Sequence, residues 1–262
     1  MRASLSVVFL LLAGTGSAFA AGTCPAPKPM HFEVDHKLYR NVLGFTEGLE
    51  FHDHALYEST GALGGGTRLM RIAEDGKTTI LNDFGQKYFG EVLTFLGDRG
   101  YQLTWQDHLV FVYDKDFKVI RTMKNPHDGW GMTNDGRYLI FGDGSSHVYF
   151  ADPQDFAIKG DVVVREGART IDNINELEYV GGKIYANIWM TRTIVRFDEK
   201  SGCVEAVANM DTLWDHMSAQ ESDYTDRDSD FVLNGIAYDP DTKFFTVMGK
   251  EWPFAFVGRF TE

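Results

Sequence analysis

The stretch Phe45-Thr-Glu-Gly-Leu49 decides the fold, because it returns four more times in altered form. In each copy a polar or aromatic residue stands two positions before an apolar residue that opens a strand-like run. The later copies are Phe89-Gly-Glu-Val-Leu93, Gly129-Trp-Gly-Met132, Ile174-Asn-Glu-Leu177 and Leu233-Asn-Gly-Ile236. The opening apolar residues are 44, 39, 45 and 59 residues apart, a spacing typical of propeller blades of about four strands. We therefore predict an all-β, five-bladed β-propeller with four-stranded antiparallel blades around a central channel.

Within each repeat, two short runs of alternating residues flank a tight turn, which is the signature of a hairpin. The clearest examples are residues 49–57, 93–101 and 177–185. Outer strands are expected to follow, as in residues 69–80 and 194–204. The long gap before the fifth copy, residues 210–230, is expected to hold a short helix and a charged surface loop.

The repeat also predicts a site, because a ring of blades places equivalent positions around one axis. The residues that hold the same place in the five copies are Glu47, Glu91, Trp130, Asn175 and Asn234, and we expect them to converge on one pocket. Trp105 and Trp189 each follow a blade-opening leucine by 12 residues, where the second strand of the hairpin should end. Lys250 follows Ile236 by 14 residues. For Asn234 a structural role, in which its amide satisfies backbone groups of a loop, is the competing interpretation.

The first 20 residues have the three-part form of a cleavable secretory signal. Arg2 precedes an apolar run at residues 5–13, and small residues end in Ala18-Phe-Ala20. Residues 21–262 are then expected to form a single domain that is exported, to the periplasm or the medium. The two cysteines, Cys24 and Cys203, are expected to form a disulfide in such a compartment, and two unpaired thiols are the alternative.

The chain carries a formal net charge of −13, which argues against nucleic acid or an anionic membrane as a partner. No second apolar stretch is long enough to cross a membrane. The repeats follow one another without a linker rich in Pro, Gly or Ser, so one closed domain is favoured over two. We expect a monomer.

Nine short phrases, in order, resemble the glutaminyl-peptide cyclotransferase family of the plant and bacterial type. They fall between residues 32 and 260, and nine in sequence make an unrelated propeller a poor explanation. The phrases are FTEGL (45–49), LYESTG (56–61), YFGE (88–91), YQLTW (101–105), GWG (129–131), NELEY (175–179), ANIW (186–189), VLNGI (232–236) and GKEWP (249–253).

The resemblance implies a five-bladed propeller and a transferase that converts the N-terminal glutamine of peptides or proteins to pyroglutamate, with release of ammonia and without a catalytic metal. The family's catalytic glutamate falls on Glu91. Asn175 and Lys250 are candidates to donate to the carbonyl oxygen as negative charge develops there. Implied substrate contacts fall on Phe45, Glu47, Trp105, Trp130, Asn175, Trp189 and Lys250, and Asn234 joins them from its axis position.

Two positions depart from the family pattern: Glu47 stands where glutamine is usual, and Val92 stands where glycine is usual. Two carboxylates in a dry pocket do not both ionise easily, so one pKa is expected to rise. A calcium-dependent propeller hydrolase of the lactonase type stays open as an alternative, because Glu47, Asn175 and Asn234 all supply oxygen. A ligand-binding pseudoenzyme and a structural calcium ion at the axis also stay open.

Overall fold

A computed structural model describes residues 23–61, 66–226 and 230–262. The predicted secretory signal at residues 1–20 lies outside the described residues. Strands make up most of the described chain, so the all-β prediction is confirmed.

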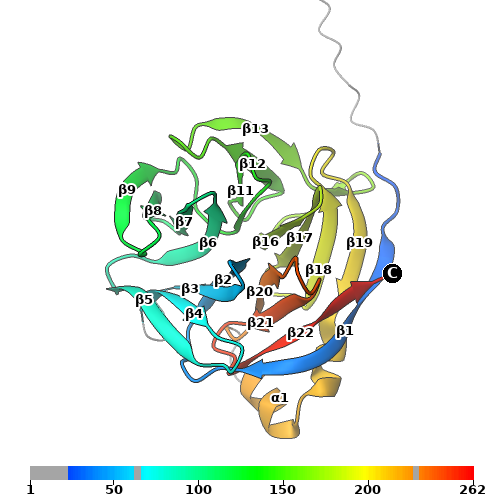
Figure 1. The fold of residues 1–262 in the computed structure, drawn as a ribbon. Coiled ribbons are helices and arrows are strands. Elements are labelled where there is room, and N and C mark those ends of the chain that lie inside the picture. The colour runs from blue at the N-terminus through cyan, green and yellow to red at the C-terminus, as the bar shows by residue number, and fades with distance from the viewer. Residues whose placement is uncertain (1–22, 62–65, 227–229) are drawn as a thin grey trace, which may run out of the picture.

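Consecutive strands form three antiparallel sheets of four strands each within the described residues (Figure 1). The first contains β2 (Thr46–His52), β3 (Ala55–Thr60), β4 (Thr67–Ile72) and β5 (Thr78–Gly85). The second contains β6 (Gly90–Leu96), β7 (Arg99–Thr104), β8 (Leu109–Tyr113) and β9 (Val119–Lys124). The third contains β10 (Met132–Asn134), β11 (Leu139–Gly142), β12 (His147–Ala151) and β13 (Ile158–Val163). A small hairpin of β14 (Arg165–Glu166) and β15 (Arg169–Thr170) follows.

A larger sheet of eight strands in the described chain joins the two ends of the sequence. Its order is β16 (Ile174–Val180), β17 (Lys183–Ile188), β18 (Thr193–Asp198), β19 (Val204–Asn209), β1 (Lys28–Tyr39), β22 (Phe254–Thr261), β21 (Phe245–Gly249) and β20 (Leu233–Tyr238). Neighbours are antiparallel except for the parallel pair of β1 and β19. The sheet therefore consists of two antiparallel runs of four strands, and β1 completes the second run beside the C-terminal strand (Figure 1).

The first strands of these runs contact one another in a ring. β2 contacts β6 and β20, β10 contacts β6 and β16, and β16 contacts β20. The hairpins predicted at residues 49–57, 93–101 and 177–185 are confirmed as β2–β3, β6–β7 and β16–β17. The ring brings the starts of five widely separated segments close together, which no local pattern alone achieves.

Apolar side chains fill the spaces between neighbouring sheets. Val92, Leu103 and Met132 belong to one buried cluster that joins the second and third sheets. Val92, one of the two departures from the family pattern, is fully buried there and does not line the cavity described below. Dense packing on both sides holds each inner strand in place, so the side chains at the strand starts have a rigid support.

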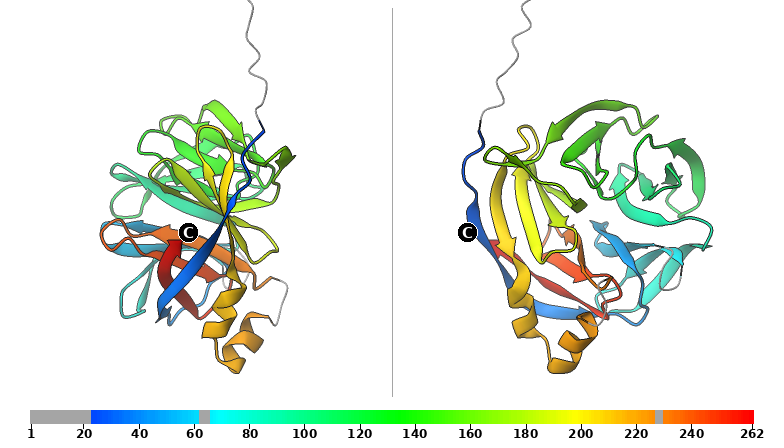
Figure 2. Two further views of the ribbon diagram at one scale, coloured as in Figure 1. Left: turned by 90° about the vertical axis from the view of Figure 1, so that its right-hand side faces the viewer. Right: turned by 180° about the vertical axis from the view of Figure 1, so that it is seen from behind.

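The segment before β20 contains two short helical elements instead of the single helix predicted. They are the 3₁₀ helix η1 (Met210–His216) and α1 (Ala219–Thr225). Ser218 and Glu221 form a capping box at the start of α1, which satisfies backbone N–H groups at its first turn. Lys37 on β1 donates to both carboxylate oxygens of Glu221 at 2.9 Å, so the helical segment that projects from the sheets in Figure 2 is held against β1.

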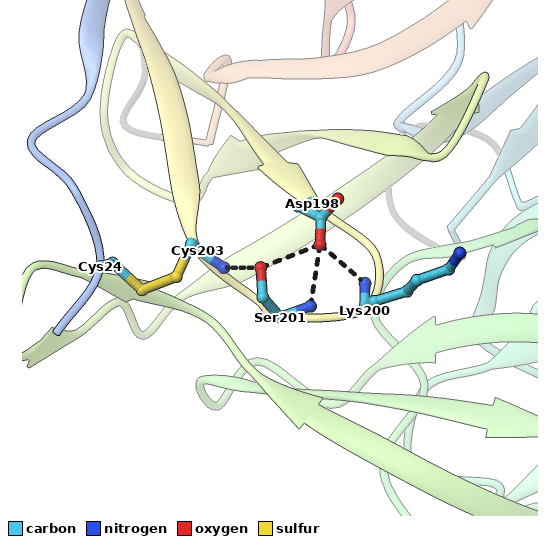
Figure 3. Close-up of a disulfide and its surroundings, with 5 residues drawn as sticks. All are labelled: Cys24, Asp198, Lys200, Ser201 and Cys203. Carbon is cyan, nitrogen blue, oxygen red and sulfur yellow. Dashed lines mark hydrogen bonds between the residues drawn. A yellow bond between two sulfur atoms is a disulfide. The ribbon is translucent and has the colours of Figure 1, made fainter. Parts of the chain in front are cut away.

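A disulfide joins Cys24 and Cys203, as predicted, with their Cα atoms 5.3 Å apart. It ties the arm before β1 to the turn between β18 and β19 (Figure 3). Asp198 shapes that turn by accepting from the backbone N–H and the hydroxyl of Ser201, both at 2.9 Å. A disulfide is typical of proteins that fold in an oxidising compartment.

No helix within the described part of the chain is long and apolar enough to cross a bilayer.

Candidate active site

A cavity of about 260 Å³ lies at the end of the ring where the inner strands begin. The second strand of each hairpin runs back to this same end, because the two strands are antiparallel. Eight of the residues predicted from the sequence line the cavity: Phe45, Glu47, Glu91, Trp105, Trp130, Asn175, Trp189 and Lys250. Asn234 does not line it.

An irregularity in strand pairing recurs at four of the five axis positions. The register between the first and second strands shifts at Glu47, at Glu91, at Asn175 and at Asn234. Such bulges leave a residue out of the regular ladder and re-aim its side chain, and they are common beside active sites. The alternation of a regular strand does not predict them.

A backbone hydrogen bond fixes the residues at the ends of the second strands. Trp105 N–H donates to Phe89 O at 2.9 Å, Trp189 N–H donates to Asn173 O at 2.8 Å, and Lys250 N–H donates to Val232 O at 2.9 Å. In each case the acceptor lies two residues before an axis position. Trp105, Trp189 and Lys250 are therefore equivalent positions of the repeat.

Glycine occupies this same position in the other two repeats, and both glycines make room for pocket side chains. An added Cβ at Gly61 would lie 2.6 Å from the Phe89 ring and 3.0 Å from Glu47 Oε1. An added Cβ at Gly144 would lie 2.5 Å from the Trp130 ring. The absent side chains thus allow Glu47, Phe89 and Trp130 to approach the cavity.

Aromatic rings wall the cavity on two sides. On one side Phe89 packs edge-on against Phe45 and Trp105, with ring centroids 6.4 and 5.4 Å apart. On the other side Trp130 packs edge-on against Trp189 at 5.4 Å. Trp105 and Trp189 are more than one-third exposed, so the walls reach from the buried floor to the solvent.

The floor holds two carboxyl groups and one ammonium group. Lys250 Nζ lies 2.5 Å from Glu47 Oε2 and 4.5 Å from the centroid of the Phe45 ring. Glu47 also shares a hydrogen bond with Glu91. All three side chains are buried.

Burial raises the pKa of Glu47 above its ordinary value, against the opposing charge of Lys250. Burial first, and then the charge of Glu47, raise the pKa of Glu91 well above its ordinary value. Because Lys250 contacts Glu47 directly, the geometry favours a charged Glu47 and a protonated Glu91.

The two asparagines bond to each other and to the backbone. Asn175 Nδ2 donates to Asn234 Oδ1 at 2.9 Å, and Asn234 Nδ2 donates to Thr46 O at 3.0 Å. Asn234 is fully buried behind the cavity. Its contacts fit the structural interpretation, in which it connects β20 and β16 to the start of β2, and not the predicted contact with substrate.

Within residues 23–61, 66–226 and 230–262, no group of three or more His, Cys, Asp or Glu side chains is arranged to hold a metal ion. The oxygen donors considered for calcium are also in use by other groups. Asn234 Oδ1 accepts from Asn175, and Glu47 is paired with Lys250. An ammonium group beside Glu47 repels a divalent cation, so this donor set does not fit a calcium ion at the axis.

The comparison that decides the family is a match to the protein family described as glutamine cyclotransferase, which covers residues 6–260. The chain belongs to the glutamine cyclotransferase family. A glutaminyl-peptide cyclotransferase of Arabidopsis thaliana is 35% identical over 212 residues, which are 80% of this chain and 65% of the relative's own length.

A solved structure gives the same family assignment. The crystal structure of Myxococcus xanthus glutaminyl cyclase is 30% identical, with a TM-score of 0.76. The alignment covers 89% of this chain and 98% of that one. The similarity therefore extends over the sheets that build the cavity.

A buried ion pair of Arg40 and Glu58 holds two cavity segments together in this glutamine cyclotransferase family member. Arg40 Nη2 donates to Gly44 O at 3.1 Å, just before Phe45. Arg40 Nε donates to Trp252 O at 2.8 Å, two residues after Lys250. Thr46 Oγ1 donates to Glu58 Oε1 at 2.7 Å. The ion pair thus links the segment of Glu47 to the turn that carries Lys250.

Sequence reasoning missed three residues that line the cavity of this family member: Phe89, Val232 and Asp230. Phe89 and Val232 stand two residues before Glu91 and Asn234, as Phe45 stands before Glu47, so the repeat contained a signal for both. Asp230 lies in the irregular segment before β20, where the repeat gives no signal.

Proposed function

We propose that this protein is a glutaminyl-peptide cyclotransferase, which closes the N-terminal glutamine of peptides or proteins to pyroglutamate and releases ammonia. The observation that carries the proposal is the floor of the cavity, where a buried carboxyl pair and a lysine meet between aromatic walls in a chain of this family. The names of the Arabidopsis and Myxococcus relatives give the same activity.

The size of the cavity fits one residue. Its volume of about 260 Å³ is below the ~300–1,000 Å³ usual for drug-sized ligands. A glutamine side chain placed between Trp130 and Phe89 would be bent back toward its own α-amine, and a near-attack geometry is the main requirement of an intramolecular cyclisation. The remainder of the peptide would leave past Trp105 and Trp189, which reach the solvent.

Two proton movements accompany the reaction. The α-amine attacks the γ-carboxamide carbon, a C–N bond forms, and the amine loses a proton. The bond from that carbon to the amide nitrogen breaks, and the nitrogen leaves as ammonia after it gains a proton. We assign both transfers to Glu91, because one carboxyl group can give a proton to the departing nitrogen and take one from the attacking amine.

Negative charge develops on the carbonyl oxygen while the new bond forms. Asn175 Nδ2 carries two N–H donors and uses one of them on Asn234, which leaves the other for the oxygen. Lys250 supplies a fixed positive charge at the same end of the cavity. A preorganised donor of this kind contributes roughly 10²–10³ in rate.

We further propose that the domain is a single five-bladed propeller. The ring of five inner strands supports this, with the eight-stranded sheet counted as two blades joined at β19 and β1. The disulfide supports an exported protein. The pairing of Glu47 with Lys250 supports catalysis without a metal.

The test is ammonia release from a short glutamine-initiated peptide, with and without a chelator. We expect turnover that survives chelation and falls by roughly 10²–10⁴ in Glu91→Gln. Glu178→Gln is the matched control, because Glu178 is also buried on an inner strand but lies outside the cavity. Its turnover should stay within about twofold of the unmodified protein.

Two other outcomes would contradict the proposal. Ammonia release that stops with the chelator would favour a metal-dependent hydrolase. Binding of the glutamine peptide without ammonia release would favour a pseudoenzyme.

A further inference from the structure

The floor of the cavity contains one carboxyl group more than the reaction needs. Glu91 alone is enough to exchange protons with both nitrogens, yet Glu47 shares a hydrogen bond with it and binds Lys250 at 2.5 Å. Glu47 is 2% exposed. A second buried carboxyl next to the first is costly unless the pair has a defined protonation state.

We propose that Glu47 is a positioning residue that acts through Glu91: it takes the charge of Lys250, so that the carboxyl pair retains one proton and this proton resides on Glu91. The reaction then starts with Glu91 as an acid. This inference rests on the proposed function for the reaction that the proton serves, but the location of the proton is a property of the protein without substrate.

The contacts determine which carboxyl holds the proton. Lys250 lies on Glu47, so ionisation of Glu47 gains an ion pair, whereas ionisation of Glu91 would place a second negative charge against the first. If residue 47 were neutral, Lys250 would face Glu91 as the nearest carboxylate, and Glu91 would be the ionised group. The residue at position 47 thus decides whether Glu91 begins as an acid or as a base.

The charged groups that face Glu91 come from three directions. Glu47 is on β2, Lys250 follows β21, and Asp128 precedes β10. Asp128 acts at longer range and also opposes ionisation of Glu91. Asp230 lines the same cavity. Lys250 is the one cationic side chain among the described residues that line it, so its pairing with Glu47 is the contact to test.

The proton balance of this order is complete. Glu91 gives its proton to the amide nitrogen as the carbon–nitrogen bond breaks, and ammonia leaves. The attacking amine, now part of the ring, gives its proton to the Glu91 carboxylate. Glu91 returns to its protonated form, and Glu47 and Lys250 keep their charges throughout.

The experiment follows the carboxyl signals of protein labelled with ¹³C at the glutamate side chains across a pH titration, with Glu91 assigned by loss of its signal in Glu91→Gln. In Glu47→Gln we expect the midpoint of Glu91 to fall by about 1–3 pH units, which is the range for a carboxyl that gains an adjacent cation. In Lys250→Met the titration of the pair should move to higher pH. Opposite shifts from two pocket variants are not expected from general disruption of the fold.

Glu50→Gln is the matched control, since Glu50 is on the same strand as Glu47 and is outside the cavity. It should leave the midpoint of Glu91 unchanged. The kinetic counterpart is the alkaline limb of kcat/KM for a glutamine peptide, which should move to lower pH in Glu47→Gln together with the Glu91 midpoint. An unchanged Glu91 midpoint in Glu47→Gln would overturn the inference. Absence of turnover in the unmodified protein, with the midpoint shifted as expected, would overturn the proposed function and leave the inference in place.

Discussion

Two groups of buried carboxyls lie on the inner strands, and they differ in what surrounds them. In the cavity, Glu47 and Glu91 bond to each other and to Lys250. Deeper along the inner strands, Glu50, Glu176 and Glu178 interact electrostatically with one another. Within the described residues this second group forms no ion pair with a lysine or an arginine.

The second group bonds chiefly to the backbone of neighbouring strands. Glu176 accepts from Leu49 N–H at 3.2 Å and from Ile236 N–H at 2.9 Å, and Glu178 accepts from Tyr238 N–H at 3.0 Å. These bonds join β16 to β2 and β20, which sheet pairing does not connect at this point. Burial raises the pKa of Glu176 and Glu178 well above the ordinary value. A buried carboxyl on an inner strand is therefore not by itself a sign of catalysis, whereas a carboxyl pair with a counter-charge and an opening to solvent is.

The largest effect on stability is expected from removing the counter-charge of the cavity. Lys250→Met keeps the length of the side chain but leaves Glu47 buried without its cation. Because breaking a buried pair on one side costs about 3–5 kcal/mol, we expect a loss of that size in the free energy of unfolding at pH 8, measured by denaturant titration. At pH 5 the loss should be smaller, since the carboxyls can take up protons.

A double variant separates loss of the ion pair from loss of packing on Phe45. Adding Glu47→Gln to Lys250→Met should recover more than half of the stability lost at pH 8. Lys115→Met is the control, because Lys115 pairs with Asp116 in an exposed position, where an ion pair contributes little. Unchanged stability of Lys250→Met at pH 8 would mean that the cavity carboxyls need no cation, as in the deeper group.

The deeper group should make stability depend on pH. Burial raises the pKa of Glu50 from 4.5 to about 8, so between these values the folded protein holds a proton that the unfolded chain has released. The unfolded state then binds fewer protons, and stability falls as the pH rises from about 4.5 to 8, by up to ~1.4 kcal/mol per pH unit for each such group. In Glu50→Gln the slope of the free energy of unfolding against pH should decrease. The exposed Glu74→Gln should keep the slope of the unmodified protein, and an equal slope in Glu50→Gln would refute the assignment.

The repeat explains how much of this arrangement was predictable from the sequence. One offset before the opening apolar residue picks out Glu47, Glu91 and Asn175, and one offset after it picks out Trp105 and Trp189. Because the strands of a hairpin are antiparallel, both offsets lead to the same end of the ring. The all-β fold, the hairpins and the positions of the cavity residues follow from periodicity of this kind.

Periodicity does not predict which side chains pair across the ring. The contact between Lys250 and Glu47 joins residues 203 positions apart, and the bond between Asn175 and Asn234 joins different repeats. Both depend on the register shifts at the strand starts, which regular alternation does not contain. The ion pair of Arg40 with Glu58 was missed for the same reason, since Arg40 lies outside the repeated phrases.

The smallest expected effect tests whether the cavity walls adapt where the packed interior does not. Gly144→Ala places a methyl group against the Trp130 ring, at a position where φ is +82°. The backbone strain alone costs about 1–2 kcal/mol, and Gly136→Ala measures it separately, because Gly136 has φ of +84° and no neighbouring atom within 4 Å of an added Cβ. If Trp130 moves aside toward the open cavity, the two variants should be equally stable. In that case KM for a glutamine peptide should rise roughly three- to tenfold only in Gly144→Ala, which corresponds to ~0.7–1.4 kcal/mol of lost contact. A much larger loss of stability in Gly144→Ala than in Gly136→Ala would show that Trp130 is held as rigidly as a core residue, and the aromatic wall would then belong with the packed interior.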